Sequence, residues 1–158
     1  MNPKIYLVRK YSDKVEIFYE DKIFIKVKRT FSFWGKMLST FTVEEKIILK
    51  STYDIVFYKK YITITYQDLE SPLTLRQARG DYFLYVNNLS LALKRSYFKN
   101  PIFTISDRNL ILGTVDSQIF GFIGSYLDYT ITLHCNEKDE IYCLIRFLIE
   151  LEDLPTSN

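Results

Sequence analysis

The sequence predicts a mainly β protein of the α+β class, a closed or nearly closed antiparallel barrel of about twelve strands around a hydrophobic C-terminal helix. Three observations lead to this prediction. The chain is rich in Tyr and Phe, with 13 and 12 in 158 residues, and these residues favour pleated, half-buried surfaces. Apolar and polar residues alternate in many short segments. One segment near the C-terminus is apolar on nearly every side.

The predicted helix spans about 137–153. A surface helix keeps one apolar stripe, whereas a helix that is apolar on nearly all sides is buried on nearly all sides. Its apolar run of about eleven residues is shorter than the roughly 20 needed to cross a bilayer, so a core helix is favoured over a membrane span. Its apolar residues are Ile141, Tyr142, Cys143, Leu144, Ile145, Phe147, Leu148, Ile149 and Leu151.

Arg146 and Glu150 interrupt this run. They are four residues apart and therefore lie on one face of a helix, where they can pair. A buried charge without a partner is costly. We therefore expect these two side chains either to reach solvent through an open end of the barrel or to pair inside it. The more specific alternative is that Arg146 and Glu150 form the polar lining of a small pocket.

The strands are predicted from alternation over about 4–134. In Ile23–Arg29, for example, Ile23, Ile25 and Val27 share one face, and Lys26 and Lys28 share the other. Short strands at this spacing suggest a sandwich or a barrel, and a barrel removes sheet edges and encloses a helix. The predicted segments are Lys4–Lys10, Val15–Glu20, Ile23–Arg29, Ile47–Ser51, Asp54–Tyr58, Tyr61–Tyr66, Leu73–Arg76, Tyr82–Val86, Leu89–Leu93, Ile102–Ile105, Leu110–Val115, Ile119–Ile123 and Tyr129–His134.

Phe31–Phe41 breaks the alternation, because Phe33, Trp34, Met37, Leu38 and Phe41 recur at roughly helical spacing. We interpret this segment as a short helix or an aromatic-rich loop that plugs one end of the barrel. The alternative is an exposed partner-binding patch that contains Trp34 and Met37.

Length and charge limit the classes of function. The 158 residues fit a single domain, 1–158, and the N-terminus carries no predicted secretory signal, so we expect a cytoplasmic protein. A net charge of +2 is too small to indicate a nucleic-acid-binding protein. Two free buried thiols at Cys135 and Cys143 are favoured over one disulfide in a reducing compartment.

The sequence contains no pattern typical of an enzyme. His134 is the only histidine, and with Cys135 and Cys143 it offers fewer ligands, at other spacings, than zinc sites use. Neighbouring residues of a strand point to opposite faces, so His134 and Cys135 should not form a catalytic pair. No nucleophile elbow or phosphate loop is present. We therefore predict no catalytic residues, no metal and no cofactor.

Basic residues beside aromatic ones form the candidate binding site. Such loops suit an anionic membrane surface, where Lys and Arg meet the charge and aromatic rings settle at the headgroups. They also suit single-stranded nucleic acid, whose bases stack on aromatic rings. The alternative without a binding function is that these charges only keep the barrel soluble. The candidate lipid- or anion-binding residues are Lys59, Lys60, Arg76, Arg79, Lys94, Arg95 and Lys99.

The order of elements resembles a known superfamily. Tyr129–His134 leading into Ile141–Leu151, and Arg108–Val115 followed by Ile119–Ile123, are similar to the last strands and core helix of the tubby C-terminal domain, the phospholipid scramblases and the LURP-one proteins. This resemblance implies a twelve-stranded barrel around a central helix, and binding of phosphoinositides or other acidic headgroups. With two Cys and the short polar tail Pro155–Asn158, no scramblase activity is expected.

The sequence thus leads to a non-enzymatic barrel that binds anionic phospholipid headgroups or a protein partner, in the cytoplasm or peripheral to a membrane. Two alternatives remain at this point. One is a barrel that binds a small apolar ligand in its lumen, as lipocalins do, which an interior helix would prevent. The other is a nucleic-acid-binding module.

Overall fold

The computed structural model describes residues 2–78, 80–97, 100–118 and 127–153. It contains twelve strands followed by one helix. The strands are β1 (Lys4–Lys10), β2 (Lys14–Tyr19), β3 (Lys22–Phe31), β4 (Met37–Val43), β5 (Lys46–Val56), β6 (Lys59–Gln67), β7 (Leu73–Ala78), β8 (Asp81–Val86), β9 (Leu89–Arg95), β10 (Phe103–Asp107), β11 (Leu110–Gln118) and β12 (Leu127–Leu133), and the helix is α1 (Glu137–Asp153).

The strands form one antiparallel sheet in the order β6-β5-β4-β3-β2-β1-β12-β11-β10-β9-β8-β7. Pairing of β1 with β12, for example Tyr6 opposite Ile131, joins the two halves of the chain. Only β6 and β7 lack a ladder, so the barrel is nearly closed, as predicted. Side chains bridge this seam: Gln67 exchanges two hydrogen bonds with the backbone of Leu73, of 2.8 and 3.2 Å, and the Tyr82 hydroxyl donates to the Lys60 carbonyl at 3.4 Å.

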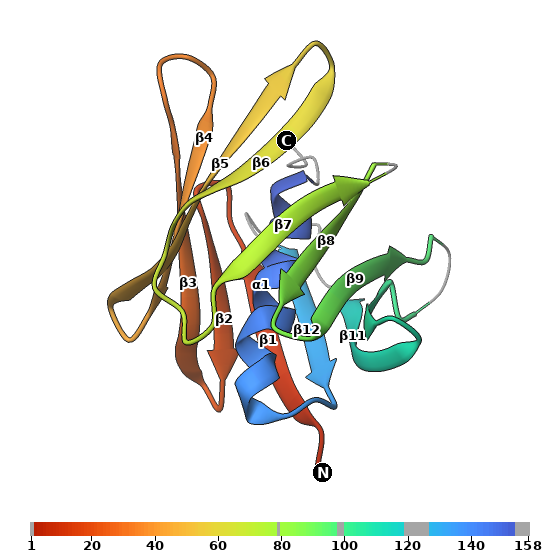
Figure 1. The fold of residues 1–158 in the computed structure, drawn as a ribbon. Helices are drawn as coiled ribbons and strands as arrows, with labels where there is room; N and C mark the ends of the chain where they lie inside the picture. The colour runs from red at the N-terminus through yellow and green to blue at the C-terminus, as the bar shows by residue number, and fades with distance from the viewer. Residues whose placement is uncertain (1, 79, 98–99, 119–126, 154–158) are drawn as a thin grey trace.

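Helix α1 lies inside the curved sheet, as Figure 1 shows. Residues from Tyr142 to Ile149 are all buried, including Leu144 and Ile145, so strands enclose the helix on nearly every side. Phe147 makes edge-to-face contacts with Phe103 of β10 and Tyr129 of β12, with ring centroids 5.8 and 5.6 Å apart. The prediction of a buried C-terminal helix over 137–153 is confirmed.

The alternation predicted for Ile23–Arg29 holds only from Ile25 onward. The register of β2 and β3 shifts at a β-bulge, where Ile17 pairs with Ile25 but the next residue, Phe18, pairs with Ile23. The extra residue, Phe24, turns toward the core and contacts the ring of Tyr6 at 5.7 Å. Ile23 is consequently half exposed, because a bulge reverses the facing of the residues beyond it.

The interpretation of Phe31–Phe41 as a helix or an end plug is wrong. This segment contains the end of β3, a tight hairpin and most of β4, with Met37 and Phe41 in the core. The hairpin projects past the barrel, so Phe33 and Trp34 are 96% and 84% exposed. Phe33 and Trp34 lie in the turn and Met37 and Leu38 begin β4, so two apolar pairs on either side of the turn's end produce an apparently helical spacing, although β4 itself obeys a period of two.

Two further predictions differ from the structure in detail. Ile47–Ser51 and Asp54–Tyr58 belong to one long strand, β5, which ends at Val56 before a turn at Phe57 and Tyr58. The predicted strand Ile119–Ile123 lies outside the described residues.

The two cysteines are free and buried, with their Sγ atoms 3.9 Å apart, as predicted. His134 is exposed while Cys135 is buried, so the two side chains lie on opposite faces as expected. Contact with Cys143 lowers the pKa of the Cys135 thiol and raises the pKa of the Cys143 thiol, and burial reinforces the second effect. Both side chains therefore act as small core residues.

Candidate functional site

Antiparallel connectivity places alternate connections at opposite ends of the barrel. One end holds the β1–β2, β3–β4, β5–β6, β7–β8 and β9–β10 connections and the C-terminal end of α1. The other end holds the β2–β3, β4–β5, β6–β7, β8–β9 and β10–β11 connections and the start of α1. In Figure 1 the first end is at the top, beside the label C, and the second is at the bottom.

Acidic residues concentrate at the end where α1 begins, which we call the acidic end. No connection at this end contains a Tyr, Phe or Trp. Lys4 and Lys46 at this end form ion pairs with carboxylates, at 3.0 Å from Glu140 and 2.9 Å from Asp68, and the exposed cations Lys22, Arg108 and Lys138 lie there as well. The acidic residues are Glu20 and Asp21, Glu44 and Glu45, Asp68 and Glu70, and Glu137, Asp139 and Glu140 in the first turn of α1.

The opposite end, which we call the basic end, carries all the predicted binding residues that the structure describes. Lys59 and Lys60 begin β6, Arg76 lies near the end of β7, and Lys94 and Arg95 end β9. All five side chains are exposed. The other two predicted residues, Arg79 and Lys99, lie outside the described residues.

These side chains share an end of the barrel but not a face of the sheet. Arg76 lies on the outer face, 5.5 Å from the ring centroid of Tyr85. Arg95 pairs with buried Phe103 and therefore faces the lumen, with its guanidinium 5.8 Å from that ring and 5.0 Å from Tyr97. Lys94, the neighbour of Arg95 on β9, faces outward. The cations thus surround the barrel mouth rather than line one strip.

Two shallow depressions on the described part of the surface bear on the site. One, of about 310 Å³, lies at the basic end between β8 and β9 and is lined by Asp81, Phe83, Lys94, Arg95 and Tyr97 among others. It brings two predicted residues together with an aromatic ring.

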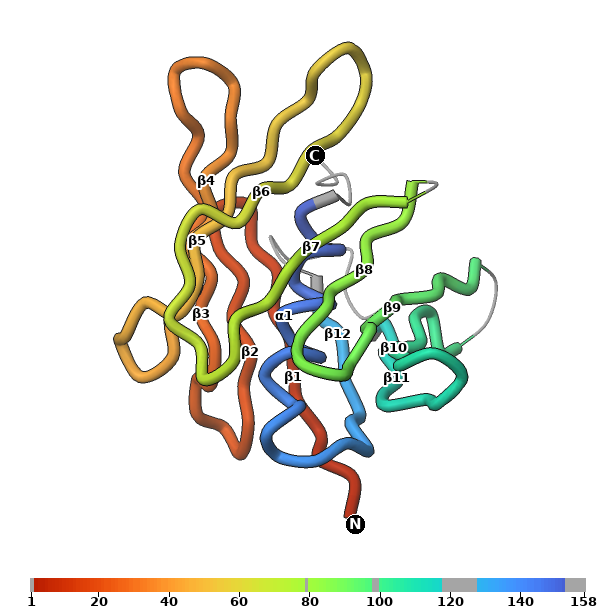
Figure 2. The backbone as a smooth tube through the Cα atoms, in the orientation of Figure 1, coloured from red at the N-terminus to blue at the C-terminus, as the bar shows by residue number. Residues whose placement is uncertain are grey.

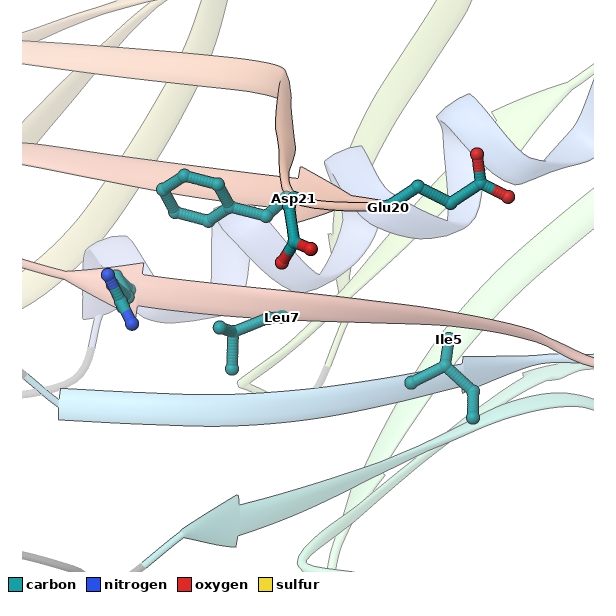
Figure 3. Close-up of a pocket in the computed structure, with 6 residues that line it drawn as sticks. Ile5, Leu7, Glu20 and Asp21 are labelled. Atoms are coloured by element: carbon teal, nitrogen blue, oxygen red, sulfur yellow. The ribbon is translucent and has the colours of Figure 1, made fainter.

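The second depression, of about 360 Å³, is shown in Figure 3. It lies on the outer surface of β1 and β2, where Ile5 and Leu7 project from β1 beside the turn formed by Glu20 and Asp21. It contains none of the predicted binding residues. Its one cation, Arg9, stacks on Phe18 at 5.5 Å and lies 3.7 Å from Asp128.

Large apolar residues are exposed at the tips of two hairpins at the basic end; sequence reasoning gave exposure of Trp34 only as the alternative for the first tip and missed the second tip. The tip of β3–β4 carries Phe33 and Trp34, whose rings form an edge contact with centroids 5.6 Å apart. The tip of β5–β6 carries Phe57 and Tyr58, which are 91% and 101% exposed. The exposed apolar residues at the two tips and their flanks are Phe31, Phe33, Trp34, Leu38, Ile55, Val56, Phe57, Tyr58 and Tyr61.

The turn at Phe57 and Tyr58 has an unfavourable composition for its geometry. Both residues have positive φ in the left-handed region, 49° for Phe57 and 65° for Tyr58. Such two-residue turns favour Asn and Gly, and bulky residues in this conformation cost about 1–2 kcal/mol each. At the acidic end the corresponding turns use Glu20 with Asp21 and Glu44 with Glu45. Aromatic residues at a turn are the sequence signal that could have identified this tip.

Charged groups also lie inside the basic end. Lys10, Arg29 and Glu152 are buried there, and burial lowers the pKa of both cations and raises the pKa of the Glu152 carboxyl. Arg146, also buried, pairs with Glu150 at 3.3 Å, as predicted from their spacing. Burial lowers the pKa of Arg146 as well. These groups keep the interior of the basic end polar.

Lys10 provides a pH-dependent prediction. Burial and the nearby charge of Arg29 lower its pKa from 10.5 to about 8, so between these values the unfolded chain binds more protons and stability rises with pH. The cost of the buried charge is fully present below pH 8. Lys10→Met should therefore raise the free energy of unfolding at pH 7 by up to about 2 kcal/mol, after allowance for screening at the barrel mouth.

Urea unfolding at several pH values measures this effect. The advantage of Lys10→Met should shrink as the pH rises from 8 toward 10. Lys26→Met, on the exposed face of β3, is the matched control and should change stability by less than about 0.5 kcal/mol at every pH. A pH-independent gain in the Lys10 variant would contradict the assignment.

The described residues contain no group of three or more His, Cys, Asp or Glu side chains that could hold a metal ion. Within the same residues, α1 is not long and apolar enough to span a bilayer. Comparison with protein families, with curated proteins and with solved structures finds no match to this chain. The resemblance to the tubby-like superfamily therefore stays a prediction, although the architecture that it implies is present.

Proposed function

We propose that the protein binds anionic phospholipid surfaces through the basic end of its barrel, and that this role is binding rather than catalysis. One observation carries the proposal: exposed cations and aromatic rings gather at one end, whereas at the other end the β2–β3, β4–β5 and β6–β7 connections carry only acidic charges and no connection contains a Tyr, Phe or Trp. The net charge of +2 conceals this polarity. An anionic surface attracts the basic end and repels the acidic end, so the charge distribution also orients the barrel.

The number of exposed cations is sufficient for reversible binding. Each Lys or Arg near an anionic bilayer contributes about 1 kcal/mol, and the attraction falls within a Debye length. Lys59, Lys60, Arg76, Lys94 and Arg95 are all exposed at the basic end, so together they supply about 5 kcal/mol when all approach the surface. Because they surround the mouth, a flat surface contacts more of them than a narrow ligand would.

The alternatives have weaker support. A small ligand in the lumen would have to displace α1, whose buried side chains fill the interior. Nucleic acid is a long polyanion, so a strand that extended along the barrel from the basic end would be repelled where it reached the acidic end. A protein partner is favoured by one specific feature: β6 ends the sheet without a ladder to β7, and an exposed edge can accept an added strand.

Sedimentation with liposomes tests the proposal. Protein should pellet with vesicles of phosphatidylcholine mixed with phosphatidylserine, and binding should weaken as salt is added, because the attraction is screened. It should remain in the supernatant with phosphatidylcholine alone. Equal recovery with the two kinds of vesicle would overturn the proposal.

A charge-matched pair of variants localises the site. Lys59→Ala with Lys60→Ala removes two cations from the basic end and should weaken partition into anionic vesicles by about 30-fold. Lys22→Ala with Lys138→Ala removes two exposed cations from the acidic end and leaves the same net charge. This control should bind as the unmodified protein does. Equal losses in both variants would mean that only net charge matters.

A further inference from the structure

The two exposed tips belong to neighbouring hairpins, and both project from the rest of the barrel. Figure 2 shows the β3–β4 and β5–β6 hairpins extending at the top, beyond the end of α1. Strands β4 and β5 pair up to Met37 opposite Tyr53, so the tips continue from one shared ladder. The Lys36 ammonium also forms an ion pair with Asp54 at 3.2 Å, which links the two hairpins near their tips.

The chemistry of the tips is layered. Phe33, Trp34 and Phe57 occupy the turns, and lysines follow immediately in the sequence, at Lys36 after the first turn and at Lys59 after the second. Exposed rings at the far point with cations behind them match the interfacial region of a bilayer, where rings enter below the headgroups and lysines meet the lipid charge.

Stability does not account for these residues. Their side chains are exposed, so they contribute little to the core, and Phe57 and Tyr58 adopt a backbone conformation that costs energy. Solubility would favour the polar turns found at the acidic end. Exposed large apolar residues gathered on neighbouring hairpins in this way mark an interaction site.

The geometry points to insertion: the β3–β4 and β5–β6 tips enter the interfacial layer of an anionic bilayer, with Trp34 and Phe57 as anchors. This inference rests on the proposed lipid-surface function and deepens it, because binding by charge alone leaves the bilayer surface intact. The bilayer is favoured over a protein partner by Lys59 and Lys60, the exposed lysines directly behind the second tip, which complement an anionic headgroup layer. Lys59 and Lys60 are therefore part of the same membrane-binding surface as the aromatic tips.

Trp34 provides a direct test, because it is the only tryptophan among the 158 residues and is exposed in the free protein. On addition of phosphatidylcholine vesicles that contain phosphatidylserine, its emission should shift to shorter wavelength. Lipids brominated on the acyl chain should quench it. Protein that pellets with these vesicles while its emission stays unshifted and unquenched would overturn insertion and leave surface binding intact. Failure to pellet would overturn both.

Variants separate insertion from general hydrophobicity. Phe33→Ser with Phe57→Ser should weaken partition into the same vesicles by about tenfold per side chain, because transfer of each ring from water is lost. The matched control is Leu110→Ser with Ile111→Ser, which removes two exposed apolar side chains at the acidic end. The control should bind normally. Thermal melts should show that both variants are folded, and equal binding by the two variants would overturn the inference.

Discussion

Leu148→Asp is expected to prevent the protein from folding to a soluble state. The Leu148 side chain is 1% exposed near the middle of α1, in the core enclosed by the sheet. A carboxylate there would be buried without a partner, and its desolvation costs several kcal/mol even after relaxation. Small domains are stable by only about 5–15 kcal/mol, so this single change removes most of the stability. Soluble expression and circular dichroism measure the outcome.

The control for this prediction is the same substitution at an exposed leucine. Leu110 is 64% exposed at the start of β11, and Leu110→Asp should leave soluble yield unchanged. Normal folding of the Leu148 variant would mean that the sheet does not enclose α1.

Phe147→Ala should destabilise the barrel by about 3–5 kcal/mol without preventing folding. Phe147 is fully buried and packs edge-to-face against Phe103 and Tyr129, so it connects α1 to β10 and β12. Truncation to Ala removes these contacts and leaves a cavity that the surrounding strands fill only in part. The free energy of unfolding in urea measures the loss.

Phe147→Leu is the graded comparison, because it keeps most of the apolar volume and loses only the aromatic contacts. It should cost less than half as much as the alanine variant. Equal losses in the two variants would show that ring geometry, rather than filled volume, determines the stability of this contact.

The insertion hypothesis and the core predictions concern the same residue types in opposite environments. Phe147 and Phe41 are buried, whereas Phe33 and Phe57 are almost fully exposed. Residue type does not distinguish these cases, because all four residues are phenylalanines. The difference arises from how far each hairpin extends past the barrel, which the register of β3, β4 and β5 determines.

Part of the candidate site could be obtained from the sequence. In an antiparallel meander, strand number alone decides which connections share an end, so Lys59, Arg76 and Lys94 belong to one end once the strands are counted correctly. The predicted strands omitted β4 and divided β5, and these two errors cancel in the count. Whether the cations share a face depends on bulges and side-chain direction, which alternation only partly specifies.

The sequence by itself determined the buried helix, the mainly β architecture and the pairing of Arg146 with Glu150, because these follow from local periodicity and from contacts within one element. Only the tertiary structure decided that the cations at the basic end point to different faces of the sheet and that Trp34 and Phe57 are exposed at the same end. Those facts depend on pairing between distant strands, where a shift of one residue turns a side chain from the core to the solvent.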